Sequence, residues 1–145
     1  MKTVKEVLAH KDQSGVVSVA PITTVYDTIQ LMSEHHIGAV PVILEGKLVG
    51  IMSERDYARK VILKDKSSKA TRVSEIMTQN VITVDPEDRV DMCVRSMRDH
   101  HIRHLIVLQE GEVVGVLSLR DLFSEIIAEQ ADTIEQLESY IRGNP

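Results

Sequence analysis

Short runs of apolar residues alternate along the chain with segments of helical spacing. Residues 16–19 form a short run of β-favouring residues that Pro21 closes, which predicts a strand. After this run, Val25, Ile29 and Met32 stand at positions i, i+4 and i+7, the spacing of one helical face. The pattern therefore predicts a strand followed by an amphipathic helix.

Two further apolar runs, residues 40–44 and 47–52, predict a β-hairpin. They are separated only by Glu45 and Gly46, and glycine adopts a positive φ at no steric cost. Ser53 follows the second run at once, and serine is a favoured N-cap residue. We therefore expect a second helix directly after the hairpin.

The same order of elements occurs twice. Residues 17–57 align with residues 82–122 at an offset of 65 without a gap. Of the 41 aligned positions, 15 are identical, whereas chance predicts about two or three from average composition. We interpret the chain as a duplication of a strand–helix–strand–strand–helix unit.

The duplication predicts the fold. One βαββα unit leaves a face of its three-stranded sheet exposed, and two units can bury these faces against each other. We therefore predict an α/β (α+β) fold in which two βαββα repeats pack sheet to sheet with pseudo-twofold symmetry, with flanking helices. Residues 1–72 are expected to form the first repeat with an N-terminal helix and a polar linker, 73–122 the second repeat, and 123–145 a C-terminal helix.

Composition and charge exclude several classes of protein. The chain has 145 residues, of which 43% are hydrophobic, and a formal net charge of −5, which gives no reason to expect nucleic acid as a partner. No apolar run approaches the roughly 20 residues that span a bilayer, and the N-terminus is too polar for a signal peptide. A single cysteine excludes an internal disulfide. We expect a cytoplasmic protein without a membrane partner.

The motif Gly-x-x-Ser-x-Arg-Asp occurs twice, at residues 50–56 and 115–121, each time at a predicted strand-to-helix junction. One interpretation is a capping box, in which the serine and the acidic residue bind the first backbone N–H groups of the helix. A second is ligand binding, because a carboxylate can accept both hydroxyls of a ribose and an arginine can bind phosphate. The two interpretations are compatible.

Two βαββα repeats that each end in Gly-x-x-Ser-x-x-Asp resemble the CBS domain pair, or Bateman module, and most closely its small stand-alone bacterial members and their plant organellar relatives. The resemblance covers residues 17–57 and 73–122. It implies a regulatory, non-catalytic module that binds an adenosine-containing ligand (AMP, ADP, ATP or NAD(H)) in one or both clefts between the repeats. It also implies a homodimer, and a partner protein that such a module regulates.

The resemblance also implies a set of site residues. Asp56 and Asp121 match the family's ribose-binding aspartates. The other positions comprise hydroxyls and arginines of the motif, hydroxyls in the first strands, a basic pair before the second strand, and residues beside the adenine. They are Ser53, Ser118, Arg55, Arg120, Ser18, Thr83, Arg103, His104, Ala39 and Pro41.

The family's arrangement further implies how these residues are shared between the two sites. Arg103, His104 and Arg120 are expected to face the ligand whose ribose Asp56 holds. The Asp121 site would then have Arg55 but no basic pair, so it would be weaker, empty or open to a larger ligand.

After Asp121 the chain lacks proline up to Gly143, and apolar residues recur at alternating steps of four and three from Phe123 to Ile141. This helix either packs on its own module or pairs with the same helix of a second copy, and we favour the homodimer.

The sequence allows functions other than nucleotide binding. The chain could be a ligand-free module that only dimerises or docks on a partner enzyme. An enzyme is not expected, because the sequence contains no nucleophile elbow and no Walker phosphate loop. The histidine pairs at residues 35–36 and 100–101 lack the partners of a metal site and fall at predicted helix ends, so no metal is expected.

Overall fold

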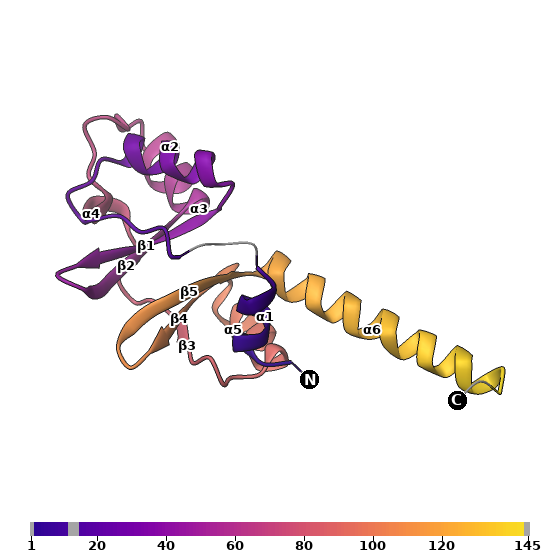
Figure 1. Cartoon of the computed structure of the whole chain (residues 1–145). Helices are drawn as coiled ribbons and strands as arrows, with labels where there is room; N and C mark the ends of the chain where they lie inside the picture. Colours follow the sequence, from indigo (N-terminus) through magenta and orange to yellow (C-terminus); the bar gives the residue numbers. More distant parts are fainter. Residues whose placement is uncertain (1, 12–14, 144–145) are drawn as a thin grey trace.

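The computed structural model describes residues 2–11 and 15–143, and its elements follow the predicted order twice (Figure 1). The first half carries, in chain order, α1 (Val4–His10), α2 (Val25–His35), β1 (Ala39–Leu44), β2 (Lys47–Ser53), α3 (Glu54–Tyr57) and the π-helical turn η1 (Ala58–Ile62). The second half carries α4 (Val73–Ile76), β3 (Thr83–Val84), α5 (Val90–His100), β4 (His104–Gln109), β5 (Glu112–Ser118) and α6 (Leu119–Ile141).

The strands form two small sheets. β1 pairs antiparallel with β2, while β3, β4 and β5 form a sheet in which β3 runs parallel to β4. Figure 1 shows both sheets between α2 and α3 on one side and α1 and α5 on the other. The mixed α/β fold with two repeats packed sheet to sheet is therefore confirmed.

The first strand of each repeat is shorter than the sequence predicts. Only Val19 of the run at residues 16–19 pairs, through an isolated parallel bridge to Val42. Its counterpart at the offset of 65 is Val84, which pairs with Val107 within β3 and β4. Directly after Val19 the chain turns, because Thr23 donates its N–H to the carbonyl of Ala20. The pairing with β1 therefore does not continue beyond Val19.

The two hairpin turns confirm the prediction from their sequence. Glu45 and Gly46 have φ values of 52° and 78°, and Glu110 and Gly111 have 52° and 81°. A positive φ at both central residues defines the turn whose twist matches that of the flanking strands. The two hairpins therefore have the same geometry in both repeats.

The short helix that precedes each repeat packs into the core of the other repeat. Val4 and Val7 of α1 lie in the core cluster of the second repeat. Val73 and Ile76 of α4 lie in the core cluster of the first repeat. The predicted boundary between the two repeats, at residues 72 and 73, stays a prediction. In space, the two repeats exchange the helices α1 and α4.

The glycine of each motif makes room for the exchanged helix. A Cβ atom on Gly50 would lie 2.6 Å from Sδ of Met77, which follows α4, and one on Gly115 would lie 2.7 Å from Cδ2 of Leu8 in α1. A side chain at either position would force Met77 or Leu8 to shift from its present place against the strand. Close approach therefore explains why a glycine stands at both positions.

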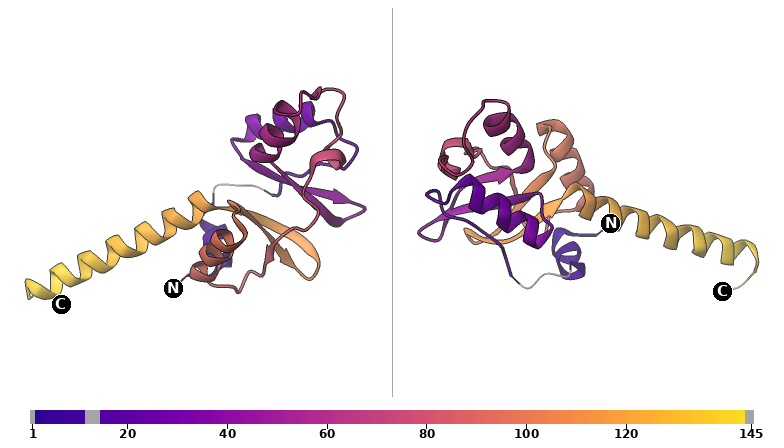
Figure 2. Two further views of the ribbon diagram at one scale, coloured as in Figure 1. Left: turned by 180° about the vertical axis from the view of Figure 1, so that it is seen from behind. Right: turned by 90° about the horizontal axis from the view of Figure 1, so that it is seen from above.

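The last helix leaves the body of the molecule. α6 starts at the Ser118 N-cap and runs for 23 residues, so it is about 35 Å long. Its first turns pack against α1 and α5, and the rest projects into open space, as both views of Figure 2 show. Gly143 closes the helix with a φ of 75°, as its sequence predicts.

Candidate functional site

Two cavities lie between the repeats, one beside each motif aspartate. The first, which we name the Asp56 pocket, has a volume of about 390 Å³. The second, the Asp121 pocket, has a volume of about 360 Å³. Each combines the motif of one repeat with residues of the other, since the second repeat's Arg103 and His104 line the Asp56 pocket. A ligand in either pocket would therefore touch both repeats.

Asp56 is held by four hydrogen-bonding groups. Its Oδ2 accepts from the N–H of Ser53 at 2.9 Å and from the Ser53 hydroxyl at 3.0 Å. Its Oδ1 lies 3.0 Å from Nζ of Lys60 and 3.4 Å from the hydroxyl of Thr78. The side chain is only 13% exposed, yet it lines the pocket. The carboxylate is thus fixed in place at the wall of the cavity.

Asp121 has a similar position but different partners. Its Oδ2 accepts from the N–H of Ser118 at 2.8 Å and from Nζ of Lys11 at 2.8 Å. Lys11 also donates to the carbonyl of Val116 at 2.7 Å. Because Lys11 follows α1, this ion pair depends on the exchange of that helix into the second repeat.

The structure confirms the capping-box interpretation of the motif, and this leaves room for the ligand-binding interpretation. Ser53 accepts from the N–H of Asp56, and Ser118 from the N–H of Asp121, each at 3.1 Å, which completes the predicted capping boxes. Both aspartates nevertheless line the pockets. The capping contacts orient the carboxylates and do not turn them away from the cavities.

The distribution of the two motif arginines differs from the expectation. Arg120 lines the Asp121 pocket and Arg55 lines the Asp56 pocket, so each arginine lies beside its own aspartate. The expected exchange, with Arg120 facing the ligand of Asp56, was wrong. The physical reason is that each arginine directly precedes its aspartate in the first turn of one helix. Arg55 also donates to the carbonyl of His101 at 3.1 Å, which ties α3 to the end of α5.

Three other expected site residues lie outside both pockets. Ser18 and Thr83 are exposed and line neither cavity, while their neighbours Val17 and Ile82 do. Successive side chains of an extended chain point to opposite faces, so the hydroxyls face away from the cleft. Pro41 is buried in β1 and lines neither cavity, whereas Ala39 lines the Asp121 pocket.

His104 lines both pockets. Burial of its ring lowers the pKa of His104, and this outweighs the opposing effect of the Asp121 carboxylate. The ring packs so closely on Gly38 that a Cβ there would lie 3.2 Å from two ring atoms. His104 is therefore a largely uncharged wall between the two cavities near neutral pH.

Among the pocket residues that the sequence did not indicate, three contact the motif aspartates directly, namely Lys60, Thr78 and Lys11. Lys60 had a detectable signal, because it stands four residues after Asp56 on the same helical segment. Thr78 and Lys11 had none, since they reach the aspartates only through the exchanged segments around α4 and α1. Local spacing contains no information about such an exchange.

The histidine pairs fall at helix ends, as expected. His36 and His101 are the C-cap residues of α2 and α5 and adopt a left-handed conformation, with φ values of 54° and 55°. Within residues 2–11 and 15–143, no three His, Cys, Asp or Glu side chains gather into a group that could hold a metal ion.

Comparison with known proteins places this geometry in a family. The model of the CBS domain matches residues 4–63 and again residues 73–128. The chain belongs to the CBS domain family. The CBS-domain-containing protein CBSX3, mitochondrial, of Arabidopsis thaliana is 36% identical, over 97% of this chain and 72% of its own length. The solved structure of a protein with CBS domains from Burkholderia ambifaria is 46% identical, with a TM-score of 0.85 over 89% of this chain and 96% of that one.

One similar CBS structure contains an adenosine nucleotide. The CBS domain protein PAE2072 of Pyrobaculum aerophilum, complexed with AMP, is 27% identical and has a TM-score of 0.73 over 83% of this chain and 89% of that one.

Among the described helices of the present chain, none is both long and apolar enough to cross a membrane.

Proposed function

We propose that this CBS pair is a non-catalytic regulatory module that binds adenosine-containing nucleotides (AMP, ADP, ATP or NAD(H)) between its repeats. The observation that carries the proposal is the position of Asp56 and Asp121, each held by a capping box at the wall of a cavity. The AMP complex of the Pyrobaculum relative supports the ligand class. Both cavities fall within the range of about 300–1,000 Å³ that is typical of pockets for small ligands.

The residues of the Asp56 pocket match the chemistry of a nucleotide. The Asp56 carboxylate would accept hydrogen bonds from the ribose hydroxyls. Arg55 and Arg103 would bind phosphate oxygens, because a guanidinium presents paired donors. The apolar side chains of Ile51 and Ile82 offer a surface for the adenine.

The regulatory part of the proposal follows from the position of the ligand between the repeats. A bound nucleotide contacts residues of both halves and so favours one relative arrangement of the halves over another. It shifts their equilibrium by its difference in affinity for the two arrangements. A partner protein that contacts both halves would sense this change.

Calorimetric titration with AMP, ADP, ATP and NADH tests the proposal. We expect at least one of these ligands to bind the wild-type protein below millimolar concentration, and Asp56→Ala to weaken that binding at least about tenfold because the ribose loses its acceptor. Asp99→Asn is the control, since this aspartate is 64% exposed on α5 and lies outside both pockets. Absence of binding by all four ligands, or equal binding by Asp56→Ala, would contradict the proposal.

Thermal denaturation with and without each nucleotide separates this function from the alternative of a ligand-free interaction module. Such a module would show the same melting temperature with and without each nucleotide. A ligand that binds the folded state raises the stability by about 2.7 kcal/mol at a hundred times its dissociation constant.

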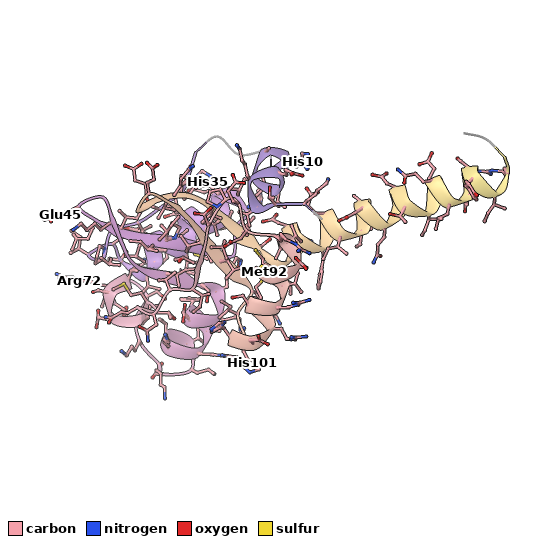
Figure 3. All side chains as sticks on the ribbon, turned by 90° about the horizontal axis from the view of Figure 1, so that it is seen from below. His10, His35, Glu45, Arg72, Met92 and His101 are labelled. Atoms are coloured by element: carbon pink, nitrogen blue, oxygen red, sulfur yellow. The ribbon has the colours of Figure 1, made fainter. Side chains whose placement is uncertain are left out.

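We also propose a homodimer that uses the projecting part of α6. Ile134, Leu137 and Ile141 are 57%, 57% and 81% exposed, and they share one helical stripe. Figure 3 shows the side chains of this part projecting away from the body. Light scattering after gel filtration should give twice the 16.3 kDa chain mass, and Leu137→Lys should shift the protein towards the monomer. A wild-type monomer at micromolar concentration would contradict this proposal.

Two further proposals complete the function. We propose that the module does not turn over its ligand and that it works in the cytoplasm. Incubation with ATP should leave the nucleotide intact, and formation of ADP or AMP would contradict the first statement. Cell fractionation followed by immunoblotting tests the second.

A further inference from the structure

The two pockets differ in charge. Among the described residues, four cationic side chains line the Asp56 pocket, namely Arg55, Arg59, Lys60 and Arg103. Two line the Asp121 pocket, Lys11 and Arg120. Glu54 lines both pockets, so each pocket contains two carboxylates, that of Glu54 and that of its own motif aspartate. The formal balance is therefore +2 in the Asp56 pocket and 0 in the Asp121 pocket.

The difference arises from positions that the duplication does not preserve. The second repeat places Arg103 directly before β4 and His104 at its start, where the first repeat has Gly38 directly before β1 and Ala39 at its start. His104 adds little charge to either pocket near neutral pH, because burial lowers its pKa. The charge difference thus depends on residues whose side chains are charged throughout the physiological range.

The lysines of the two pockets differ in exposure. Lys11 is 18% exposed and donates to both Asp121 and the carbonyl of Val116. Lys60 is 43% exposed, pairs with Asp56 four residues before it, and donates to the carbonyl of Ile76 at 2.9 Å. Each lysine thus joins its aspartate to a backbone carbonyl, and the more exposed Lys60 is the one that a ligand phosphate can reach more easily.

The free acceptor positions of the aspartates also differ. Both oxygens of Asp56 accept hydrogen bonds, and Lys60 and Thr78 occupy its Oδ1. Within the described part of the chain, Oδ1 of Asp121 accepts none. Ribose hydroxyls can therefore reach Asp121 while Lys11 stays in place. At Asp56 they compete with Lys60, and a ligand phosphate offers the released ammonium a new partner.

We propose that the pockets are specialised by ligand charge. The Asp56 pocket takes adenosine ligands with phosphate groups, and the Asp121 pocket takes uncharged adenosine nucleosides. This proposal rests on the proposed function, because it assumes that both pockets bind adenosine ligands. It makes the module responsive to two ligand classes and not to one ligand bound twice.

Single-pocket variants test the specialisation, with adenosine and AMP as the titrated ligands. Asp121→Asn leaves the Asp56 pocket intact, and this variant should bind AMP at least about tenfold more tightly than adenosine, with a preference that shrinks as salt screens the charges. Asp56→Asn leaves the Asp121 pocket intact, and this variant should bind adenosine at least as tightly as AMP. Circular dichroism checks that both variants fold.

A double variant keeps the test valid if either aspartate variant fails to fold. Arg59 and Arg103 are exposed, and within the described residues their side chains form no hydrogen bond or ion pair. Arg59→Gln with Arg103→Gln should therefore fold and lose most of the AMP preference of the wild-type protein. Arg120→Gln is the matched control, because it removes a cation from the other pocket. Two results would overturn the specialisation. One is an Asp56→Asn protein that prefers AMP over adenosine as strongly as Asp121→Asn does. The other is a double variant that keeps the wild-type preference for AMP over adenosine. Failure of the wild-type protein to bind either ligand would instead overturn the proposed function.

Discussion

Each residue of the repeated motif has its own physical reason. Gly50 and Gly115 allow an exchanged helix to approach the strand. Ser53 and Ser118 cap the helix that follows. The aspartates complete the capping boxes and line the pockets. Within seven residues, the motif therefore combines groups that the fold requires with carboxylates that line the cavities.

Gly115→Val should destabilise the protein by about 1–3 kcal/mol, because the new side chain would enter the space of Leu8 and push α1 from β5. Urea denaturation measures the change. Val114→Thr is the control, since Val114 is 38% exposed beside it and threonine keeps the β-branched shape. A free energy of unfolding for Gly115→Val within about 0.5 kcal/mol of the wild type would show that the close approach does not matter.

Cys93 should be unreactive in the folded protein. Its side chain is 1% exposed, and burial raises the pKa of its thiol to about 11, with Asp88 and Asp91 adding to the shift. Only the thiolate is nucleophilic, so at pH 8 a disulfide reagent such as DTNB should label the chain only after unfolding in denaturant. Rapid labelling of the native protein would contradict the burial of this helix face.

At the scale of elements, α1 is fixed to α6 by one acidic residue. Glu125 accepts a hydrogen bond from Lys2 at 2.8 Å and lies 2.7 Å from Nδ1 of His10, and its side chain is 11% exposed. Burial by itself raises the pKa of Glu125, but the hydrogen bonds from Lys2 and His10 together hold it below its ordinary value. Figure 3 shows His10 beside the start of α6.

This contact predicts a pH dependence of stability. Because the pKa of Glu125 is lower in the folded state, its contribution is complete above the ordinary glutamate value near 4.5 and is lost as the pH falls through the folded value. Glu125→Gln should lower the free energy of unfolding by about 1 kcal/mol at pH 7. The difference from the wild type should disappear towards pH 3 in thermal denaturation. A difference that stays constant from pH 7 to pH 3 would contradict this account.

The elements that the sequence predicts are those that local spacing determines. The stripe of Val25, Ile29 and Met32, the hairpin dipeptides and the serine caps all act within a few residues, and the structure confirms them. The exchange of α1 and α4 depends on which core each helix fills, and no local pattern indicates it. For this reason Lys11 and Thr78 were missed at the pockets.

At the scale of the whole molecule, duplication produces two pockets from one motif, and later divergence makes them unequal. The backbone of the two repeats matches closely, down to the turns and the left-handed histidine caps. Arg103 directly before β4 and Arg59 of η1 have no cationic counterpart at the Asp121 pocket, so the charges of the two pockets differ. A symmetric fold thus carries two pockets of unequal charge.

The exchanged helices connect each pocket to the other half of the chain. Lys11, next to α1, reaches the aspartate of the second repeat, and Thr78, next to α4, reaches that of the first. A ligand that displaces either contact would change how an exchanged segment is held. This gives a nucleotide a direct physical route to the arrangement of the two repeats.

A crystal structure of the protein grown with AMP tests the central claim most directly. The account predicts electron density for AMP in the Asp56 pocket, with a ribose hydroxyl within hydrogen-bond distance of the Asp56 carboxylate and the phosphate beside Arg103. An AMP molecule bound elsewhere, with its ribose away from both motif aspartates, or both pockets left without AMP at saturating concentration, would contradict it.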